Sequence, residues 1–220
     1  LEHPHILRLL GARMHEAYPV LIYRAPKGRF LSELLHQGAT WSSTNTFRWA
    51  LRLVEAVAFL HQRGWIHRDI RPQNIWLQPA RRSEAASLTL AEFGLCGPLG
   101  STDIVGAPTH KAPEVARGQA HEARSAIYAL GLTLYEWFSG QPAFDARTRD
   151  EWLRIQHSQV THPLDRLAPE YAERAPELIF LIHGCLEKNP HIRPQNAGEL
   201  LDRLLACTEL FLPSAPKSLE

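Results

Sequence analysis

Helical periodicity dominates the second half of this sequence and limits the fold more than any other feature. Apolar residues recur every three or four positions in several segments, which we predict to be helices at residues 125–138, 150–158, 177–187 and 196–207. An earlier helix is expected after Ser42 or Ser43, either of which can cap it, and Gly64 ends it. A chain with about five such helices cannot be organised around a large sheet, so we expect a mainly α fold of the α+β class.

Extended patterns are short and lie near the start and in the middle of the chain. Two apolar runs read as adjacent strands, at residues 6–10 and 20–23, and Pro26 and Gly28 then indicate a turn. A short helix is predicted at residues 30–35. Further along, the pattern predicts a small hairpin with strands at 74–77 and 88–90 around a loop at 81–87, and a long irregular segment at 94–113.

The charge balance and the cysteines limit the partners and the compartment. The formal net charge is only +1, so neither nucleic acid nor a membrane surface is expected as a partner. No apolar stretch reaches the roughly 18 residues that span a bilayer. Cys96, Cys185 and Cys207 form neither a disulfide framework nor a zinc signature, which indicates a reducing compartment. We therefore expect a cytoplasmic protein. Because the sequence opens on Leu1, we also expect it to be a piece of a longer one.

The most informative motif lies at residues 67–74, which read His-Arg-Asp-Ile-Arg-Pro-Gln-Asn. A polar cluster at the end of a helix can produce such a match by accident. Here the run follows a long amphipathic helix and precedes an apolar strand pattern at residues 75–77. Motif and context together resemble the catalytic loop of protein kinases, in which an Asn follows the Asp by five places. The pair Arg71-Pro72 resembles the Ser/Thr rather than the tyrosine type.

Other landmarks of this family follow in order. Residues 92–94 (Glu-Phe-Gly) stand where the family carries Asp-Phe-Gly, and residues 112–114 (Ala-Pro-Glu) resemble the end of its activation segment. Arg193 resembles the family's partner for Glu114, which implies a buried bidentate ion pair.

The resemblance covers about residues 1–205. It implies the large C-terminal lobe of a protein kinase, with remnant small-lobe strands at the N-terminus. We expect a kinase-like domain at residues 1–208 and a tail at 209–220.

The resemblance also implies ATP and Mg²⁺ as cofactors and gives roles to individual residues. Asp69 would orient the substrate hydroxyl and accept its proton, with Arg71 near the γ-phosphate. Asn74 and Glu92 would hold Mg²⁺. The adenine would lie against the hinge and the strand after the catalytic loop, at Ile22, Tyr23, Ala25 and Leu77.

Several positions depart from the family pattern. The sequence contains no Gly-rich phosphate loop and no strand lysine, so the chain alone is expected to bind ATP poorly. Glu92 keeps the carboxylate of the usual Asp but adds a methylene, which conflicts with the strict geometry of Mg²⁺. Arg71 replaces a Lys. Ala107 replaces a Thr that bonds the catalytic Asp, and Ala126 replaces an Asp that braces the catalytic loop, at a cost of about 1–3 kcal/mol.

Two functions follow from these observations, and both remain open at this point. The changes at the metal, the phosphate and the support of the base favour a pseudokinase, an impaired lobe that acts in signalling by binding a regulatory protein partner. The intact Asp69 and Asn74 favour an active Ser/Thr kinase that phosphorylates a protein substrate once a small lobe is present.

The activation segment carries hydroxyls that are candidates for phosphorylation. Ser101, Thr102 and Thr109 lie in this segment, and Thr102, ten residues before Ala112, is near the usual position of an activating phosphate, with Arg68 as its expected partner. The alternatives are that these hydroxyls are simply solvated, or that Asp103 already supplies part of the charge.

Overall fold

Helices are the dominant element in the computed structural model, which describes residues 2–78, 86–144, 148, 150–151 and 163–211. Their bounds are α1 Leu31–His36, α2 Ser43–His61, α3 Pro113–Ala116, α4 Ala123–Ser139, α6 Leu164–Leu167, α7 Pro169–Arg174, α8 Pro176–Cys185, α9 Ala197–Ala206 and α10 Thr208–Phe211. Single 3₁₀ turns are η1 Pro72–Asn74, η2 Phe93–Leu95 and η3 Pro108–His110. The predicted mainly α fold of the α+β class is confirmed.

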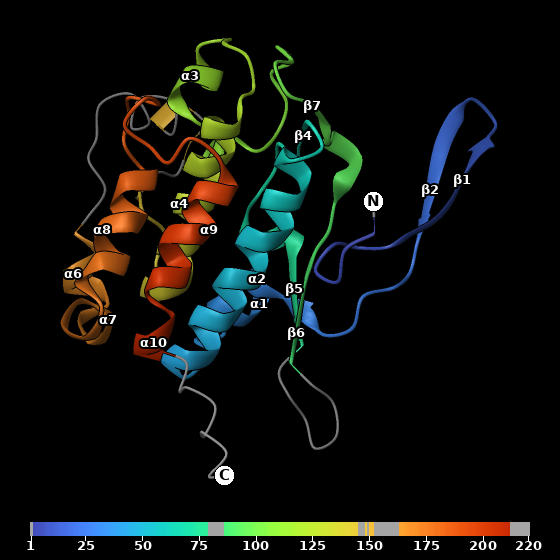
Figure 1. Cartoon of the computed structure of the whole chain (residues 1–220). Coiled ribbons are helices and arrows are strands. Elements are labelled where there is room, and N and C mark those ends of the chain that lie inside the picture. Colours follow the sequence, from blue (N-terminus) through green and yellow to red (C-terminus); the bar gives the residue numbers. More distant parts are fainter. Residues whose placement is uncertain (1, 79–85, 145–147, 149, 152–162, 212–220) are drawn as a thin grey trace, which may run out of the picture.

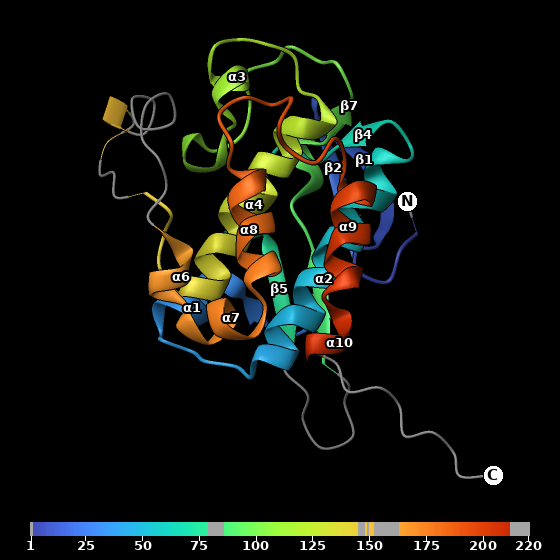
Figure 2. The same cartoon turned by 60° about the vertical axis from the view of Figure 1, so that its left-hand side comes forward.

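The core lies between α2 and α4, the two helices with the most buried side chains. Ser42 caps α2, because its hydroxyl accepts the N–H of Asn45 at 3.4 Å. At the other end, His61 Nδ1 accepts the N–H of Ala197 at 3.1 Å, which ties α2 to the start of α9 alongside it (Figures 1 and 2). α4 ends at Gly140, whose φ of 71° lies in the left-handed region typical of helix C-termini.

The strands form small separate sheets. Their bounds are β1 Leu9–His15, β2 Tyr18–Tyr23, β3 Arg29–Phe30, β4 Trp65–Ile66, β5 Ile75–Gln78, β6 Ser87–Leu90 and β7 Gly97–Pro98. β1 and β2 form an antiparallel hairpin that stands apart from the helices (Figure 1). β5 is the central strand of β3-β5-β6, and β4 pairs with β7. The last two sheets hold the segments on either side of residues 67–74.

The predicted strands and helices are confirmed with shifts. The first strand was predicted too early, because β1 begins at Leu9, whereas Ile6 is 5% exposed and bridges to Leu90 of β6. Ile6 therefore belongs to the core of the lobe rather than to the hairpin. The sequence did not predict α6 or α7. The predictions for residues 81–87, 150–158 and the final tail lie wholly or mostly outside the described residues.

The three cysteines are free thiols. Cys185 and Cys207 are buried, and burial raises the pKa of Cys185 to about 12. Cys96 is half-buried. No helix in the described part of the chain is long and apolar enough to cross a bilayer.

Candidate active site

Residues 67–74 form a loop between β4 and β5, reached directly from the end of α2. Pairing of β4 with β7 fixes one end of the loop, and η1 with Pro72 at its first position fixes the other. Within the turn, the N–H of Asn74 donates to the carbonyl of Arg71 at 2.9 Å. Arg68 has a φ of 67°, an uncommon left-handed conformation for a residue with a side chain.

Asp69 lies at the centre of the site, with only 9% of its surface exposed. Asn74 Nδ2 donates to Asp69 Oδ2 at 2.7 Å and to the Asp69 main-chain oxygen at 2.7 Å. Arg71 Nε donates to the same Oδ2 at 3.2 Å. The other oxygen, Oδ1, accepts the N–H of Ala107 at 3.0 Å. Donors from two distant segments therefore fix the carboxylate in one orientation.

His67 supports this loop from inside the core. Its Nε2 lies 2.8 Å from the carbonyl of Ala91, and its Nδ1 accepts the N–H of Asp69 at 3.3 Å. This pair of contacts assigns the proton to Nε2. Burial lowers the pKa of His67 to about 4, so the ring is neutral at physiological pH. His67 is thus a structural link between Asp69 and the strand end at Ala91.

Glu92 is placed beside the catalytic loop by its neighbour in the chain. The N–H of Ala91 donates to the carbonyl of Asn74 at 2.9 Å, so Glu92 follows directly on a contact with the loop. Glu92 adopts a left-handed φ of 64°. The structure therefore brings the backbones of the two predicted metal-binding residues, Asn74 and Glu92, close together.

The residues present at these positions fit a hard cation. With the Nδ2 of Asn74 turned towards Asp69, its amide oxygen remains available as a ligand. The Glu92 carboxylate is a second oxygen ligand of the kind that Mg²⁺ takes, with phosphate oxygens completing its shell. The described residues contain no group of three or more His, Cys, Asp or Glu that could hold a metal by themselves.

Arg68 connects the catalytic loop to the irregular segment after β7. Its guanidinium contacts the hydroxyl of Ser101 and, at 3.2 Å, the carboxylate of Asp103. The Arg68 side chain is almost fully buried, whereas Asp103 is largely exposed. His121 adds a second link, because its Nε2 lies 2.9 Å from the Asp103 carbonyl. The structure thus places the Ser101 hydroxyl in contact with Arg68, whereas the sequence singled out Thr102.

The two alanine replacements have different structural outcomes. Ala107 lacks the hydroxyl expected there, but its main-chain N–H bonds Asp69. Ala126 is buried and lines a small cavity of about 20 Å³ beneath the loop, together with Arg68 and Ile70. Thr133, two turns further along α4, donates its hydroxyl proton to the carbonyl of Ala129 at 2.9 Å, and the same hydroxyl lies 3.4 Å from the carbonyl of Ile70. The side of the loop that faces α4 therefore has a small cavity at Ala126, with the Thr133 hydroxyl near the carbonyl of Ile70.

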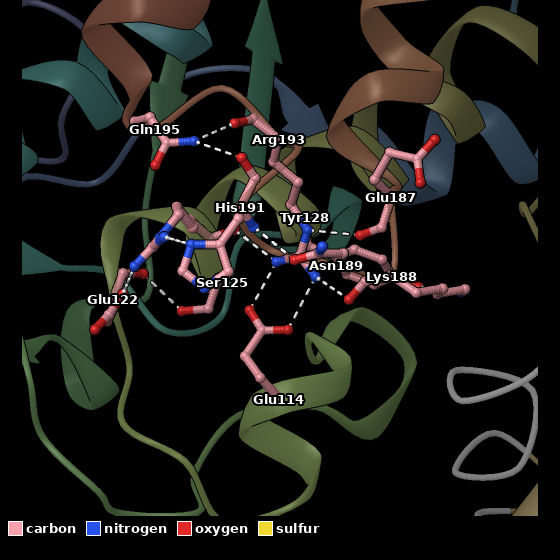
Figure 3. A network of polar contacts seen from close by, with 11 residues as sticks. Glu114, Glu122, Ser125, Tyr128, Glu187, Lys188, Asn189, His191, Arg193 and Gln195 are labelled. Atoms are coloured by element: carbon pink, nitrogen blue, oxygen red, sulfur yellow. Dashed lines mark hydrogen bonds and ion pairs between the residues drawn. The ribbon is translucent and has the colours of Figure 1, made fainter.

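The Glu114–Arg193 pair has the bidentate geometry that the sequence predicted (Figure 3). Arg193 Nη1 donates to Glu114 Oε1 at 2.7 Å, and Nη2 donates to Oε2 at 2.9 Å. The Arg193 side chain is fully buried. Its remaining donors reach three main-chain oxygens, of Arg124, Glu187 and Lys188. One side chain therefore joins α3, the start of α4 and the loop after α8.

A catalytic loop of this sequence, a neighbouring acidic residue and this ion pair form a set that is specific to one family. Comparison with known protein families agrees, because residues 1–204 match the family described as "Protein kinase domain". The chain belongs to the eukaryotic-type Ser/Thr protein kinase family.

Relatives of this kinase domain occur in bacteria and plants. It is 31% identical to the serine/threonine-protein kinase pkn2 of Myxococcus xanthus over 94% of the chain and 25% of that protein. It is 28% identical to the serine/threonine-protein kinase PknB of Mycolicibacterium smegmatis over 100% of the chain and 36% of that protein. It is 33% identical to the serine/threonine-protein kinase RUNKEL of Arabidopsis thaliana over 89% of the chain and 14% of that protein. The chain thus spans about a third or less of these relatives.

The residues predicted to face adenine lie in two different environments, the end of the hairpin and the core of the lobe. Ile22 and Tyr23 end β2, where the N–H of Arg24 bonds the carbonyl of Arg8, and Ala25 follows in the exposed connection to the lobe. Leu77 is 0% exposed and lies in the core, so its side chain has no surface to offer a ligand. Because side chains alternate along a strand, Trp76 lies on the opposite face of β5, where its ring is 4.3 Å from that of Phe30. Of the neighbouring residues Trp76 and Leu77, only Trp76 therefore has a partly exposed side chain.

Proposed function

We propose that this kinase domain is the catalytic and substrate-binding half of an ATP-dependent Ser/Thr protein kinase whose phosphotransfer is impaired at the metal site. The observation that carries this proposal is the Asp69 carboxylate, which Asn74, Arg71 and the Ala107 N–H hold in one orientation. A carboxylate fixed in this way can orient a Ser or Thr hydroxyl for in-line attack on a phosphoryl group.

Each residue of the site has a proposed role. When bound, Mg²⁺–ATP supplies the phosphoryl group and neutralises its charge. Asp69 accepts the proton of the protein hydroxyl, and Arg71 directs its terminal NH₂ groups to the γ-phosphate. The amide oxygen of Asn74 and the carboxylate of Glu92 would hold the metal. The main chain of Tyr23 and Ala25 would bond the adenine edge, with Ile22 and Trp76 packed against its ring.

Glu92 is the proposed cause of the impairment. Mg²⁺ requires near-ideal octahedral geometry at about 2.0–2.1 Å, and the extra methylene of Glu moves the carboxylate relative to the backbone that positions it. The backbone itself is held by the contact between Ala91 and Asn74. The chain therefore cannot easily move back to compensate, and slow catalysis is expected even with a small lobe present.

A second candidate is a pseudokinase that acts only by binding a regulatory protein. The observation that favours it is the cavity beside Ala126, because the void removes a support from the loop that carries Asp69. A loosely supported loop loses the sub-ångström positioning that catalysis needs. The Glu114–Arg193 scaffold is kept in either case.

Phosphotransfer from labelled ATP to a protein substrate distinguishes the two candidates. The assay uses a version of the protein extended to include a small lobe, with Mg²⁺ and Mn²⁺ compared. We expect slow incorporation that Asp69→Asn abolishes and Glu92→Asp accelerates. Incorporation no greater than that of Asp69→Asn, even after the Glu92→Asp repair, would contradict the kinase proposal and support a binding role.

We also propose a slightly longer domain than residues 1–208. Phe211 of α10 is 1% exposed and stacks on Phe47 of α2 at 4.5 Å. The hydroxyl of Thr44 donates to the Phe211 carbonyl at 2.8 Å. Because these contacts attach Phe211 to the N-terminal turns of α2, we propose to end the domain at Phe211.

A further inference from the structure

Helix α8 is mostly apolar, and one of its faces is uncovered. Its residues are Pro-Glu-Leu-Ile-Phe-Leu-Ile-His-Gly-Cys, a composition typical of a helix buried all round. Leu178 and Ile182 are indeed fully buried, and α8 packs against α4 and α7. Phe180, however, is 79% exposed, the highest value for any large apolar side chain in the described part of the protein. A single exposed ring is common on protein surfaces, so the surroundings of Phe180 decide what it can do.

Phe180 stands at the edge of an open groove of about 620 Å³. The groove lies between the start of α8 and the end of α9 with α10, which follows directly below α9 in both views (Figures 1 and 2). Its floor includes Leu181 and Ala206, and Leu210 is partly exposed beside it. A volume of this size accommodates an aromatic side chain with its neighbours.

Charged residues of both signs surround the apolar part of the groove, namely Arg174, Arg203, Glu177 and Glu209. Arg203 is paired within its own helix to Glu199, and Arg174 reaches Ser43. Glu177 and Glu209 make no ion pair with the described residues. The surface therefore presents two cations and two anions around one projecting ring and one hollow.

We propose that a second copy of this chain occupies the groove, with Phe180 of each copy inserted into the groove of the other. A two-fold interface uses the same patch on both subunits, so the patch must be complementary to itself. This patch carries both the projection and the hollow, and equal numbers of both charge signs. Under a two-fold rotation, arginines of one copy can approach the acids of its partner.

The size of the patch determines how strong the association is. Stable interfaces bury about 800 Å² on each partner, with aromatic anchors at the centre and charged residues at the rim. Ten residues line the groove, fewer than the roughly 20–30 that each side of a standard interface contributes. The dimer is therefore a weak one that forms in the micromolar range and weakens as salt is raised.

Sedimentation velocity of the full chain over about 1–100 µM tests the proposal. We expect a monomer–dimer equilibrium whose dissociation constant Phe180→Ser raises at least tenfold. Tyr18→Ser is the matched control, because Tyr18 is an aromatic residue 72% exposed on the β1–β2 hairpin. Both side chains project into solvent, so thermal melting should show that both variants fold like the parent.

Three results would overturn the proposal. The first is a chain that stays monomeric over the whole range. The second is a dimer that Tyr18→Ser weakens and Phe180→Ser does not, which would assign association to the hairpin. The third is a dimer that forms only when the chain is shortened to end at Phe211, which would assign the groove to the segment after α10.

Discussion

At the scale of single residues, Asp69 and Arg193 are both charged and nearly buried, but they are satisfied differently. Asp69 depends on an amide, a guanidinium and one main-chain N–H. The Arg193 guanidinium donates to one carboxylate and to three main-chain carbonyls, so each of its three nitrogens has an acceptor. The sequence predicted the partner carboxylate from the family motif. It did not predict the carbonyls, because no residue pattern records which main-chain oxygens converge in space.

The buried pair gives a prediction at this scale. Glu114→Gln should lower the free energy of unfolding by about 3–5 kcal/mol, because it leaves the Arg193 guanidinium buried without a counter-charge. Urea unfolding measures the change. Glu199→Gln is the control: it breaks the exposed pair with Arg203 on α9 and should cost less than about 1 kcal/mol. Equal effects of the two changes would mean that the buried pair contributes no more than a surface one.

At the scale of elements, the helices that the sequence predicted are those whose apolar residues recur with a helical period. α2, α4, α8 and α9 have repeating apolar positions over two turns or more, and the sequence predicted each of them. α6 and α7 have only four and six residues and begin beside or at a proline, so they are too brief to show a period. The early start predicted for β1 has another cause. Ile6 is apolar like a strand residue, yet it is drawn into the lobe by its bridge to Leu90.

The alternation of β5 gives the prediction for this scale. Leu77→Ala should lower the free energy of unfolding by about 2–5 kcal/mol, because Leu77 is fully enclosed in the core. Trp76→Ala should cost less stability and instead raise the KM for ATP in the extended kinase. Unfolding curves and nucleotide titrations on the same two variants check both outcomes. If Leu77→Ala instead lost nucleotide affinity while keeping full stability, Leu77 rather than Trp76 would be the residue that faces the ligand.

At the scale of the whole molecule, the site is assembled from segments far apart in the chain. Asp69 meets Ala107, His67 meets Ala91, and Arg68 meets Asp103. Composition and spacing alone could not predict these contacts, because they depend on the pairing of β4 with β7 and of β5 with β6. The family resemblance supplied the order of the motifs. The structure added the main-chain bond from Ala107 and the void at Ala126, which the resemblance suggested only as losses.

Buried histidines make the stability of the whole fold depend on pH. Burial lowers the pKa of His61, His67 and His110 to about 4 in each case, against an ordinary value of 6.5. Because the folded-state pKa is the lower one, the unfolded chain binds more protons between pH 6.5 and 4. The stability that depends on these neutral rings is therefore fully present above pH 6.5 and falls as the pH drops towards 4.

Denaturant unfolding from pH 7.5 to 4.5 measures this dependence. Near pH 5, unfolding should take up almost one proton for each of the three histidines, a loss of about 2 kcal/mol per ring relative to neutral pH. His61→Gln should reduce the proton uptake by about one, because it removes one titrating ring. An unchanged slope in that variant would mean that His61 is as easily protonated when folded as when unfolded.

The position of Arg193 has a consequence for which substitutions the protein tolerates. Lysine offers a single ammonium and could satisfy only part of the four groups that the planar guanidinium reaches at once. In a library of all single substitutions selected only for soluble expression, position 193 should accept arginine and nothing else. Position 92, whose side chain is exposed, should accept many residues under the same selection. The least replaceable side chain of this kinase domain would then be one that never meets its substrate.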